Sequence, residues 1–214
     1  MTSALIIPNG TCQSWIMKDD SPLEEYRAKR HMNRTPEPEG QVEHSTAEPL
    51  FVVQKHDASH LHYDFRLEVE GVLKSWAVPK GPSMDSKVKR LAVPTEDHPV
   101  EYASFEGIIP EGEYGAGTVM VWDTGTYSNV KTDKAGNPVS MEDSLEQGHL
   151  DISLDGTKLK GRFALIRTRM VGKKPQWLLM KKKDEFARSE NDVLADRPDS
   201  AVSGRTLEEI ANQQ

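Results

Sequence analysis

Residues 55–68, KHDASHLHYDFRLE, combine the side chains that bind divalent metals with one that binds phosphate. In an extended chain alternate residues share a face. The polar face of this stretch would comprise His60, His62, Asp64, Arg66 and Glu68. The opposite face would be apolar and comprise Leu61, Tyr63, Phe65, Leu67 and Val69. The pattern predicts a strand with one face toward a core.

Two interpretations of the polar face stay open from the sequence. A half-buried antiparallel strand commonly exposes charged residues to water. This face is rich in His and Asp, however, which are ligands of transition metals, whereas Lys and Glu are typical of solvated faces. With His56 from the preceding strand, His62 and Asp64 would form a set of two imidazoles and one carboxylate. Such a set leaves coordination positions open, as in catalytic metal sites.

Arg66 follows Asp64 on the same face. A guanidinium has no acceptor and carries the same sign of charge as a metal ion, so it is no fellow ligand. An anion between the two would explain it, and phosphate is the obvious candidate. The alternative is a salt bridge from Arg66 to Glu68 or a neighbour.

A second polar cluster lies in residues 90–107, RLAVPTEDHPVEYASFEG, which Pro94 and Pro99 interrupt. Such a loop could present His98 and Tyr102 to a bound phosphate. The alternative is an ordinary turn in which Asp97 or His98 caps backbone groups. The stretch GEYGAGTV at 112–119 is no P-loop, since no Gly-Lys-Ser/Thr follows, and its glycines indicate tight backbone packing.

Composition limits the classes of function. The 214 residues carry a formal net charge of −7, so contact with nucleic acid would need a local basic groove. The single Cys12 excludes an intramolecular disulfide and a cysteine-rich zinc site. We find no signal-peptide pattern and no apolar run long enough for a membrane span. These features favour a soluble intracellular protein.

The chain divides into three zones by composition. Residues 1–48 are predicted to form a polar arm with a short helix in SPLEEYRAKRH, where Ser21 would be the N-cap, Pro22 the first helical residue and Glu24 part of a capping box. Residues 49–187 carry short strand patterns, from LFVVQK to WLLMK. Turns are expected at residues 70–71 (EG), 123–125 (DTG) and 155–156 (DG). Residues 188–214 would be a linker and a short helix opened by Thr206 and Glu209.

This pattern predicts a mainly β fold, a compact antiparallel barrel with short flanking helices at both ends. Four stretches in this order closely resemble the 3′-phosphoesterase domain of bacterial DNA ligase D: HDASHLHYDFRLE, DHPVEYASFEGIIPEGEYGAGTVMVWDTGTY, LKGRFALIRT and QWLLMKKKDEFA. The resemblance extends from about residue 22 to about residue 212, because YRAKR, TPEPEG and SGRTLEEIA are similar to the ends of that domain. No ligase or polymerase region accompanies it, as expected of a stand-alone or isolated domain.

The resemblance implies a manganese-dependent enzyme of DNA repair by end joining, with zinc or cobalt as alternative metals. Such an enzyme removes a 3′-terminal ribonucleoside from primer-template nucleic acid to leave a 3′-phosphate, and removes the 3′-phosphate to leave a 3′-hydroxyl. The implied metal ligands are His56, His62 and Asp64. The implied phosphate-site and essential residues are Arg66, Arg90, His98 and Tyr102. Supporting polar residues would be Gln54, Glu96, Arg30 and Glu37.

The resemblance further implies a prokaryotic cytoplasmic, nucleoid-associated protein. Its expected partners are nucleic acid 3′ ends and a separate ligase, polymerase or Ku protein, with no membrane. One departure concerns the arm, where the family commonly has Arg-Asp-Phe and this chain has Arg30, His31 and Met32. Two other classes of function stay open, a non-catalytic nucleic-acid-binding barrel and a metal-dependent hydrolase of small phosphoesters.

Overall fold

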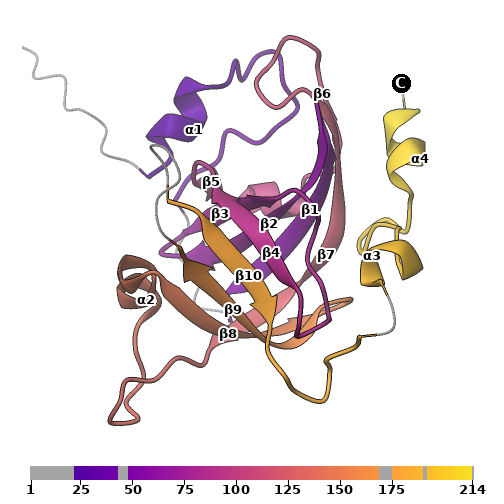
Figure 1. Cartoon of the computed structure of the whole chain (residues 1–214). Helices are drawn as coiled ribbons and strands as arrows, with labels where there is room; N and C mark the ends of the chain where they lie inside the picture. Colours follow the sequence, from indigo (N-terminus) through magenta and orange to yellow (C-terminus); the bar gives the residue numbers. More distant parts are fainter. Residues whose placement is uncertain (1–21, 43–47, 169–174, 190–191, 214) are drawn as a thin grey trace, which may run out of the picture.

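The computed structural model describes residues 22–42, 48–168, 175–189 and 192–213. Its centre is an antiparallel sheet in the order β1 (Leu50–Asp57), β2 (Leu61–Val69), β3 (Val72–Val78), β4 (Lys89–Pro94), β10 (Trp177–Lys181), β9 (Lys160–Arg167), β8 (His149–Gly156) and β7 (Gly117–Asn129). Because β1 also pairs with β7, these eight strands close into a barrel (Figure 1). The predicted mainly β barrel with short helices is confirmed.

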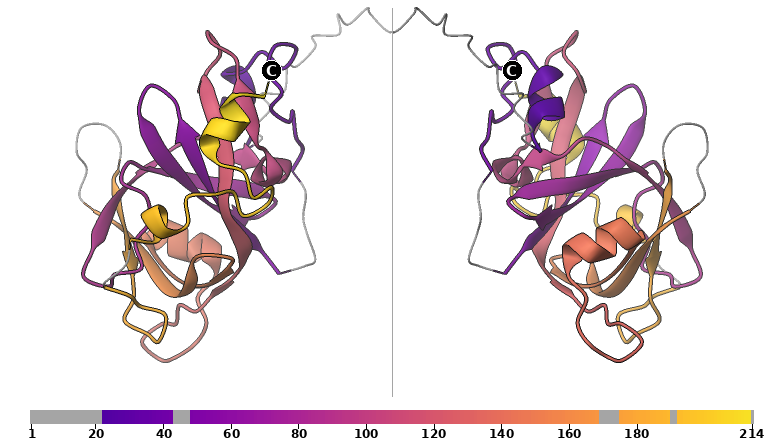
Figure 2. Two further views of the ribbon diagram at one scale, coloured as in Figure 1. Left: turned by 90° about the vertical axis from the view of Figure 1, so that its right-hand side faces the viewer. Right: turned by 90° about the vertical axis from the view of Figure 1, so that its left-hand side faces the viewer.

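Two short strands lie outside the ring. β5 (His98–Pro99) pairs with β3, and β6 (Gly107–Ile109) pairs with the first residues of β7. Between them runs the 3-10 helix η1 (Val100–Ser104). The α-helices are α1 (Glu24–Ala28), α2 (Met141–Gln147), α3 (Val193–Asp196) and α4 (Leu207–Ala211), and α4 lies against β7 (Figure 2).

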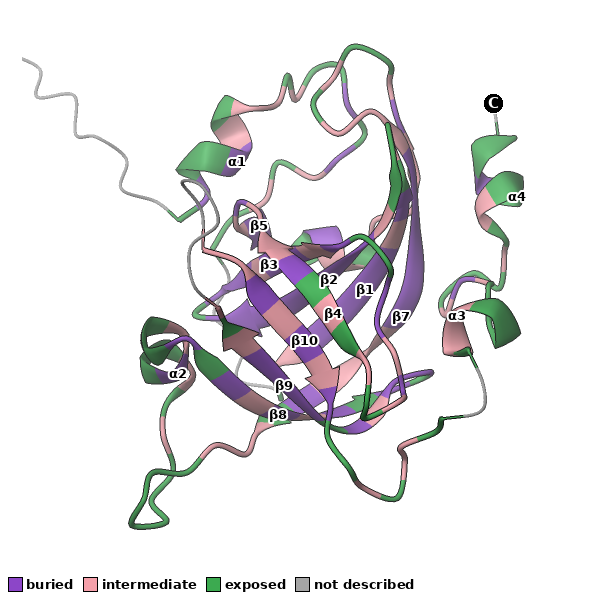
Figure 3. Cartoon of the chain, in the orientation of Figure 1, coloured by how far each residue is buried: buried purple, intermediate pink, exposed green. Residues whose placement is uncertain are grey.

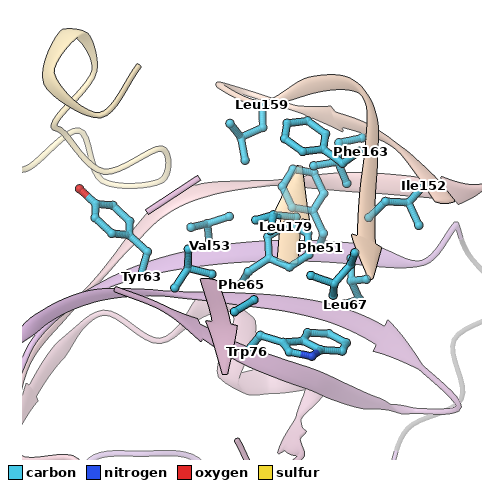
Figure 4. Close-up of a cluster of buried hydrophobic side chains, with 14 of the residues drawn as sticks. Phe51, Val53, Tyr63, Phe65, Leu67, Trp76, Ile152, Leu159, Phe163 and Leu179 are labelled. Carbon is cyan, nitrogen blue, oxygen red and sulfur yellow. The ribbon is translucent and has the colours of Figure 1, made fainter. Parts of the chain in front are cut away.

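The barrel interior holds the larger of two hydrophobic cores (Figure 4). Alternate residues of β1 and β2 point into it, including Phe51, Val53, Phe65 and Leu67, each fully buried. Figure 4 shows them meeting Leu179 and Phe163 from the opposite wall. The other parity of the same strands therefore faces outward, and that parity includes His56, His62, Asp64 and Arg66.

A second, smaller core covers this outer face. Tyr26 of α1 and Tyr102 of η1 pack on outward side chains of the barrel, and all of them are buried. The outward residues of this core are Val52, Leu73 and Val121. As a result β2 is buried on both faces from Tyr63 onward (Figure 3), although its sequence alternates as in a half-exposed strand.

Several local predictions are confirmed. Glu70 (φ 50°) and Gly71 (φ 79°) form the tight turn between β2 and β3. A hairpin of β8 and β9 forms as predicted, but its turn lies at residues 157–159, because Asp155 and Gly156 belong to β8. Thr206 and Glu209 form the predicted capping box of α4. No helix of the described residues is long and apolar enough to span a membrane.

Two predictions need correction. The predicted N-cap Ser21 lies outside the described residues, and α1 begins at Glu24 with Leu23 as N-cap and no side-chain cap. The predicted DTG turn at 123–125 is wrong, because β7 continues from Gly117 to Asn129. A register shift opposite Val53 and Gln54 bends the strand there instead. The Asp123 carboxylate accepts hydrogen bonds from the backbone of Lys158 and Leu159, both at 2.8 Å.

We predict that Gly117→Ala destabilises the protein more than Gly112→Ala. Both glycines have positive φ (143° and 90°), but a Cβ at Gly117 would lie 2.1 Å from the Asp57 carbonyl oxygen, whereas one at Gly112 has no atom within 4 Å. Gly112→Ala should cost about 1–2 kcal/mol from backbone strain alone. Gly117→Ala should cost about 1–3 kcal/mol more, from overpacking against β1. Urea denaturation followed by circular dichroism measures both, and equal losses would contradict the prediction.

Candidate metal and phosphate site

The pairing of β1 with β2 builds the candidate metal site. His56 and His62 are cross-strand partners, and their ring centroids lie 4.8 Å apart. Asp64 follows two residues after His62 on the same face. One ligand atom from each of the three lies within 4.8 Å of the others. The predicted set His56, His62 and Asp64 is therefore brought together, and His56 lies in the preceding strand as predicted.

Hydrogen bonds to backbone carbonyls orient both imidazoles. His56 Nε2 lies 2.8 Å from the Gly115 carbonyl oxygen, so this nitrogen carries the proton and Nδ1 is left as the ligand atom. His62 Nδ1 lies 2.8 Å from the His60 carbonyl oxygen, which leaves Nε2. The two remaining nitrogens are the ones that face Asp64, at 3.8 Å for His56 Nδ1 and 3.7 Å for His62 Nε2. Such outer contacts are typical of metal-ligating histidines, so the residues present fit a divalent ion.

Arg66 donates hydrogen bonds to several side chains next to the candidate metal ligands. Its guanidinium donates to the Asp64 carboxylate (3.0 Å), the Gln54 side-chain oxygen (2.9 Å) and the Ser75 hydroxyl (2.8 Å). Only 3% of its side chain is exposed. Arg66 thus has a direct partner in Asp64, and the predicted alternative of a pair with Glu68 is not what the structure shows.

The charge state of Asp64 follows from its neighbours. Burial by itself would raise the pKa of the Asp64 carboxyl, but the Arg66 guanidinium and the two histidines outweigh burial and lower this pKa from 3.8 to about 2. Asp64 is therefore an anion at neutral pH, as a metal ligand must be.

Gln54 ties this network to η1. Its side-chain amide donates to the carbonyl oxygens of Tyr102 (2.9 Å) and Phe105 (3.1 Å), while its oxygen accepts from Arg66. The Arg66 guanidinium lies 5.0 Å from the centroid of the Tyr102 ring. Burial raises the pKa of the Tyr102 phenol well above 10, so this hydroxyl keeps its proton. The predicted supporting role of Gln54 thus has a structural counterpart.

The N-terminal arm supplies the opposite wall. Arg30 donates to Glu37 (2.8 Å) and to Glu96 (3.2 Å), and its Nη2 lies 3.2 Å from His98 Nε2. The side chains of Arg30, Glu37 and Glu96 are at most 4% exposed. The division at residues 48 and 187 stays a prediction, yet residues 22–42 form part of the site.

His98 lies between the two arginines. Its Nδ1 is 2.8 Å from Arg66 Nη1 and 2.9 Å from the Glu96 carbonyl oxygen. The pairing of His98 with Leu73 on β3 places it there. Burial, together with the positive charges of Arg66 and Arg30, holds the pKa of His98 well below 6.5. His98 is therefore neutral at pH 7.

These groups line one cavity of about 170 Å³. The predicted residues that line it are Arg30, His56, His62, Asp64, Arg66, Glu96, His98 and Tyr102. Gln54 and Glu37 lie behind this lining, bonded to Arg66 and Arg30. The structure does not bring Arg90 to the cavity. Arg90 pairs with Leu179 and shares the parity of the core residue Ala92, so its phosphate contact stays a prediction.

Sequence reasoning missed six residues of the site. Ser75 and Gly115 bond to Arg66 and His56, and four more line the cavity: Ala58, Thr95, Ile109 and Tyr114. Gly115 and Tyr114 belong to GEYGAGTV, which we interpreted as packing only. Their relation to His56 depends on the pairing of β7 with β1, and no local pattern encodes that pairing.

Comparison with known proteins finds a matching family model and several relatives. Residues 54–167 match the family described as the DNA Ligase D 3′-phosphoesterase domain. A Pseudomonas aeruginosa protein named "Multifunctional non-homologous end joining protein LigD" is 55% identical over 195 residues, which cover 89% of this chain and 22% of that protein. A Mycobacterium tuberculosis protein, "Multifunctional non-homologous end joining DNA repair protein LigD", is 47% identical over 152 residues, 68% of this chain and 18% of the relative.

The fold and the site define a closed antiparallel barrel with a candidate metal site on its outer face. The chain belongs to the DNA ligase D 3′-phosphoesterase domain family, since the match covers more than half of its residues. It spans about a fifth of the length of the curated relatives it matches.

We predict that His62→Ala lowers the affinity for Mn²⁺ by about 100-fold or more, since it removes a ligand and not just an outer contact. His60→Ala is the matched control, because its side chain is exposed and its backbone carbonyl still orients His62. Isothermal titration calorimetry on metal-stripped protein measures both. Unchanged affinity in His62→Ala, or equal losses in the two variants, would contradict the assignment.

His98 should make stability fall as pH falls. Its pKa is lowered in the folded state, so below about pH 6.5 the unfolded chain takes up a proton that the folded chain does not. The free energy of unfolding should then decrease by up to about 1.4 kcal/mol per pH unit between pH 6.5 and 5. Urea denaturation in EDTA measures the free energy of unfolding at each pH. Its slope against pH should be reduced in His98→Asn and unchanged in His149→Asn, which alters an exposed histidine. Equal slopes in all three proteins would refute it.

Proposed function

We propose that this chain is a metal-dependent phosphoesterase that processes nucleic acid 3′ ends during DNA repair by end joining. It removes a 3′-terminal ribonucleoside, which leaves a 3′-phosphate, or a 3′-phosphate, which leaves a 3′-hydroxyl, or it performs both steps in turn. The observation that carries the proposal is the cavity in which His56, His62 and Asp64 lie next to Arg66 and His98. Membership of the family supports the choice of substrate.

The resident metal would be held by His56 Nδ1, His62 Nε2 and the Asp64 carboxylate. When bound, a divalent ion supplies Lewis-acid polarisation of a phosphate oxygen. Two imidazoles and a carboxylate suit manganese, our first choice, and also zinc or cobalt.

Arg66 and Arg30 would stabilise the phosphate. Both guanidinium groups line the cavity, and both point an Nη atom at His98. A neutral imidazole has only one acceptor nitrogen, so it can satisfy one of these two donors at a time. The other is left to bond to a phosphate oxygen. Donors held this way by Asp64, Gln54, Glu37 and Glu96 need little rearrangement when charge develops on the phosphoryl oxygens.

His98 and Tyr102 would divide the handling of protons. His98 is neutral and can accept a proton, and a dianionic phosphate between the two arginines would offset the charges that lower its pKa. Tyr102 keeps its phenolic proton and can donate a hydrogen bond to the phosphate or to the leaving oxygen. The proposal thus assigns His98 the role of general base and Tyr102 the role of hydrogen-bond donor.

The biological setting is also part of the proposal. The relatives are named as end-joining proteins several times longer than this chain. We propose that this chain acts on recessed 3′ ends together with a separate ligase, polymerase or Ku protein, in the cytoplasm of a prokaryote at the nucleoid.

The decisive experiment is an assay on primer-templates that end in a 3′-ribonucleotide or a 3′-phosphate and are labelled at the primer 5′ end. The metal-stripped protein is supplied with Mn²⁺, Zn²⁺ or Co²⁺ in turn. We expect shortened or dephosphorylated primers with Mn²⁺, and no product with EDTA or with His62→Ala.

Other outcomes would replace the proposal. Hydrolysis of p-nitrophenyl phosphate without action on the primers would indicate a hydrolase of small phosphoesters. Binding of the primers without turnover in any metal would indicate a non-catalytic nucleic-acid-binding barrel.

A further inference from the structure

The cavity is too small for a whole nucleotide. Its volume of about 170 Å³ is below the roughly 300–1,000 Å³ of pockets that enclose drug-sized ligands. If the proposed function holds, the cavity takes the 3′-phosphate, and the nucleoside that carries this phosphate must lie at the cavity mouth. The side chains at the mouth therefore decide how the terminal nucleoside is held.

Tyr114 is the aromatic side chain at this mouth. It lines the cavity and is 47% exposed, the one aromatic among the exposed large hydrophobic residues of the described chain. The other aromatic side chain of the lining, Tyr102, is only 2% exposed. The half-exposed Tyr114 ring can therefore contact a group that lies at the mouth, whereas the buried Tyr102 ring cannot.

The Tyr114 ring is held in place from two sides. The next residue, Gly115, has positive φ (77°), and its carbonyl oxygen accepts the hydrogen bond from His56. Backbone hydrogen bonds from Glu113 to Pro110 and from Ala116 to Glu113 fix the turn that carries the ring. On the arm side, Lys29 Nζ lies 3.3 Å from the Tyr114 hydroxyl and 4.7 Å from the ring centroid. The loop that carries the ring is thus tied to a metal ligand.

Cationic side chains lie beside the ring, although Lys29 and Arg30 are also paired with the Glu96 carboxylate. The Arg30 guanidinium carbon lies 5.5 Å from its centroid, and Lys29 is closer still. Arg34, whose side chain is 69% exposed, reaches toward Glu113 of the same loop. An aromatic platform flanked by cations is the arrangement by which proteins bind single-stranded nucleic acid, with bases on the rings and phosphates near the cations.

We infer that Tyr114 is a base-binding platform, on which the nucleobase of the 3′-terminal nucleotide stacks while its phosphate occupies the cavity. This inference rests on the proposed function and adds the element that distinguishes a nucleic acid end from a small phosphoester. It takes any of the bases, because each has a π-face.

The test measures binding while the Tyr114 side chain and the terminal nucleobase are each removed, alone and together. Two primer-templates with a recessed 3′-phosphate are compared, one with a normal terminal nucleotide and one with an abasic terminal residue. Equilibrium dissociation constants are measured by fluorescence anisotropy in EDTA, at one salt concentration, for wild type, Tyr114→Ala, Tyr114→Leu and Tyr114→Phe. EDTA prevents turnover, and the salt is fixed because phosphate contacts depend on it.

With the normal terminus, Tyr114→Ala should weaken binding by about 5- to 150-fold, the range expected for one stacked base. Tyr114→Leu should lose most of the affinity, and Tyr114→Phe should stay within about two-fold of wild type, because it keeps the ring. With the abasic terminus, wild type and Tyr114→Ala should bind equally. A terminal 2-aminopurine should change its fluorescence on binding to wild type and not to Tyr114→Ala.

Three results would overturn the inference. In the first, Tyr114→Ala weakens binding by the same factor on both primers. In the second, Tyr114→Ala leaves the affinity unchanged. In the third, Tyr114→Phe weakens binding as much as Tyr114→Ala. The last would assign the effect to the hydroxyl contact with Lys29. The outcome is separable from the proposed function: base-dependent binding without turnover in any metal would overturn only the function, and turnover with base-independent binding would overturn only the platform.

Discussion

The buried pair of Asp64 and Arg66 is the interaction on which the site depends. Each residue would be costly to bury alone, because an uncompensated charge in a protein interior costs several kcal/mol. Together they meet at 3.0 Å, and Gln54 and Ser75 satisfy further donors of Arg66. The pair gives Asp64 its negative charge at neutral pH and fixes the direction of its carboxylate. Lysine could not replace Arg66 here, since it lacks the planar fork that reaches three partners at once.

The position of this pair explains why the barrel needs its arm and η1. The barrel interior is filled by its own apolar core, so the polar parity of β1 and β2 faces outward. Left open, that face would be solvated, and water would weaken each charged interaction in it. Tyr26 and Tyr102 cover the face from the arm and from η1, and Arg30 enters with the arm. The arm is therefore part of the candidate site, although its sequence is that of a polar appendage.

Much of the fold and part of the site could be predicted from the sequence. Alternation in residues 60–69 identifies β2 and places His62, Asp64 and Arg66 on one face, since strand geometry is local. The helix start at Thr206 and the turn at Glu70–Gly71 are local as well. Other features depend on distant pairing. The continuity of β7 through Asp123–Gly125 reflects its contacts with β1 and β8, where Gly125 permits an approach that a Cβ would block at 2.1 Å from the Asp155 carbonyl oxygen.

The pKa of His98 could not be predicted from local sequence either, because it depends on residues that are distant along the chain. An imidazole free in water titrates near neutrality, as suits a general acid or base. The neutral state of His98 at pH 7 comes from Arg66 on β2 and Arg30 on the arm, 32 and 68 residues away in sequence. Under the proposed function, the two cations that lower the pKa of His98 would also bind a dianion. A phosphate bound between them would restore the basicity of His98, so this base would become effective only with substrate in place.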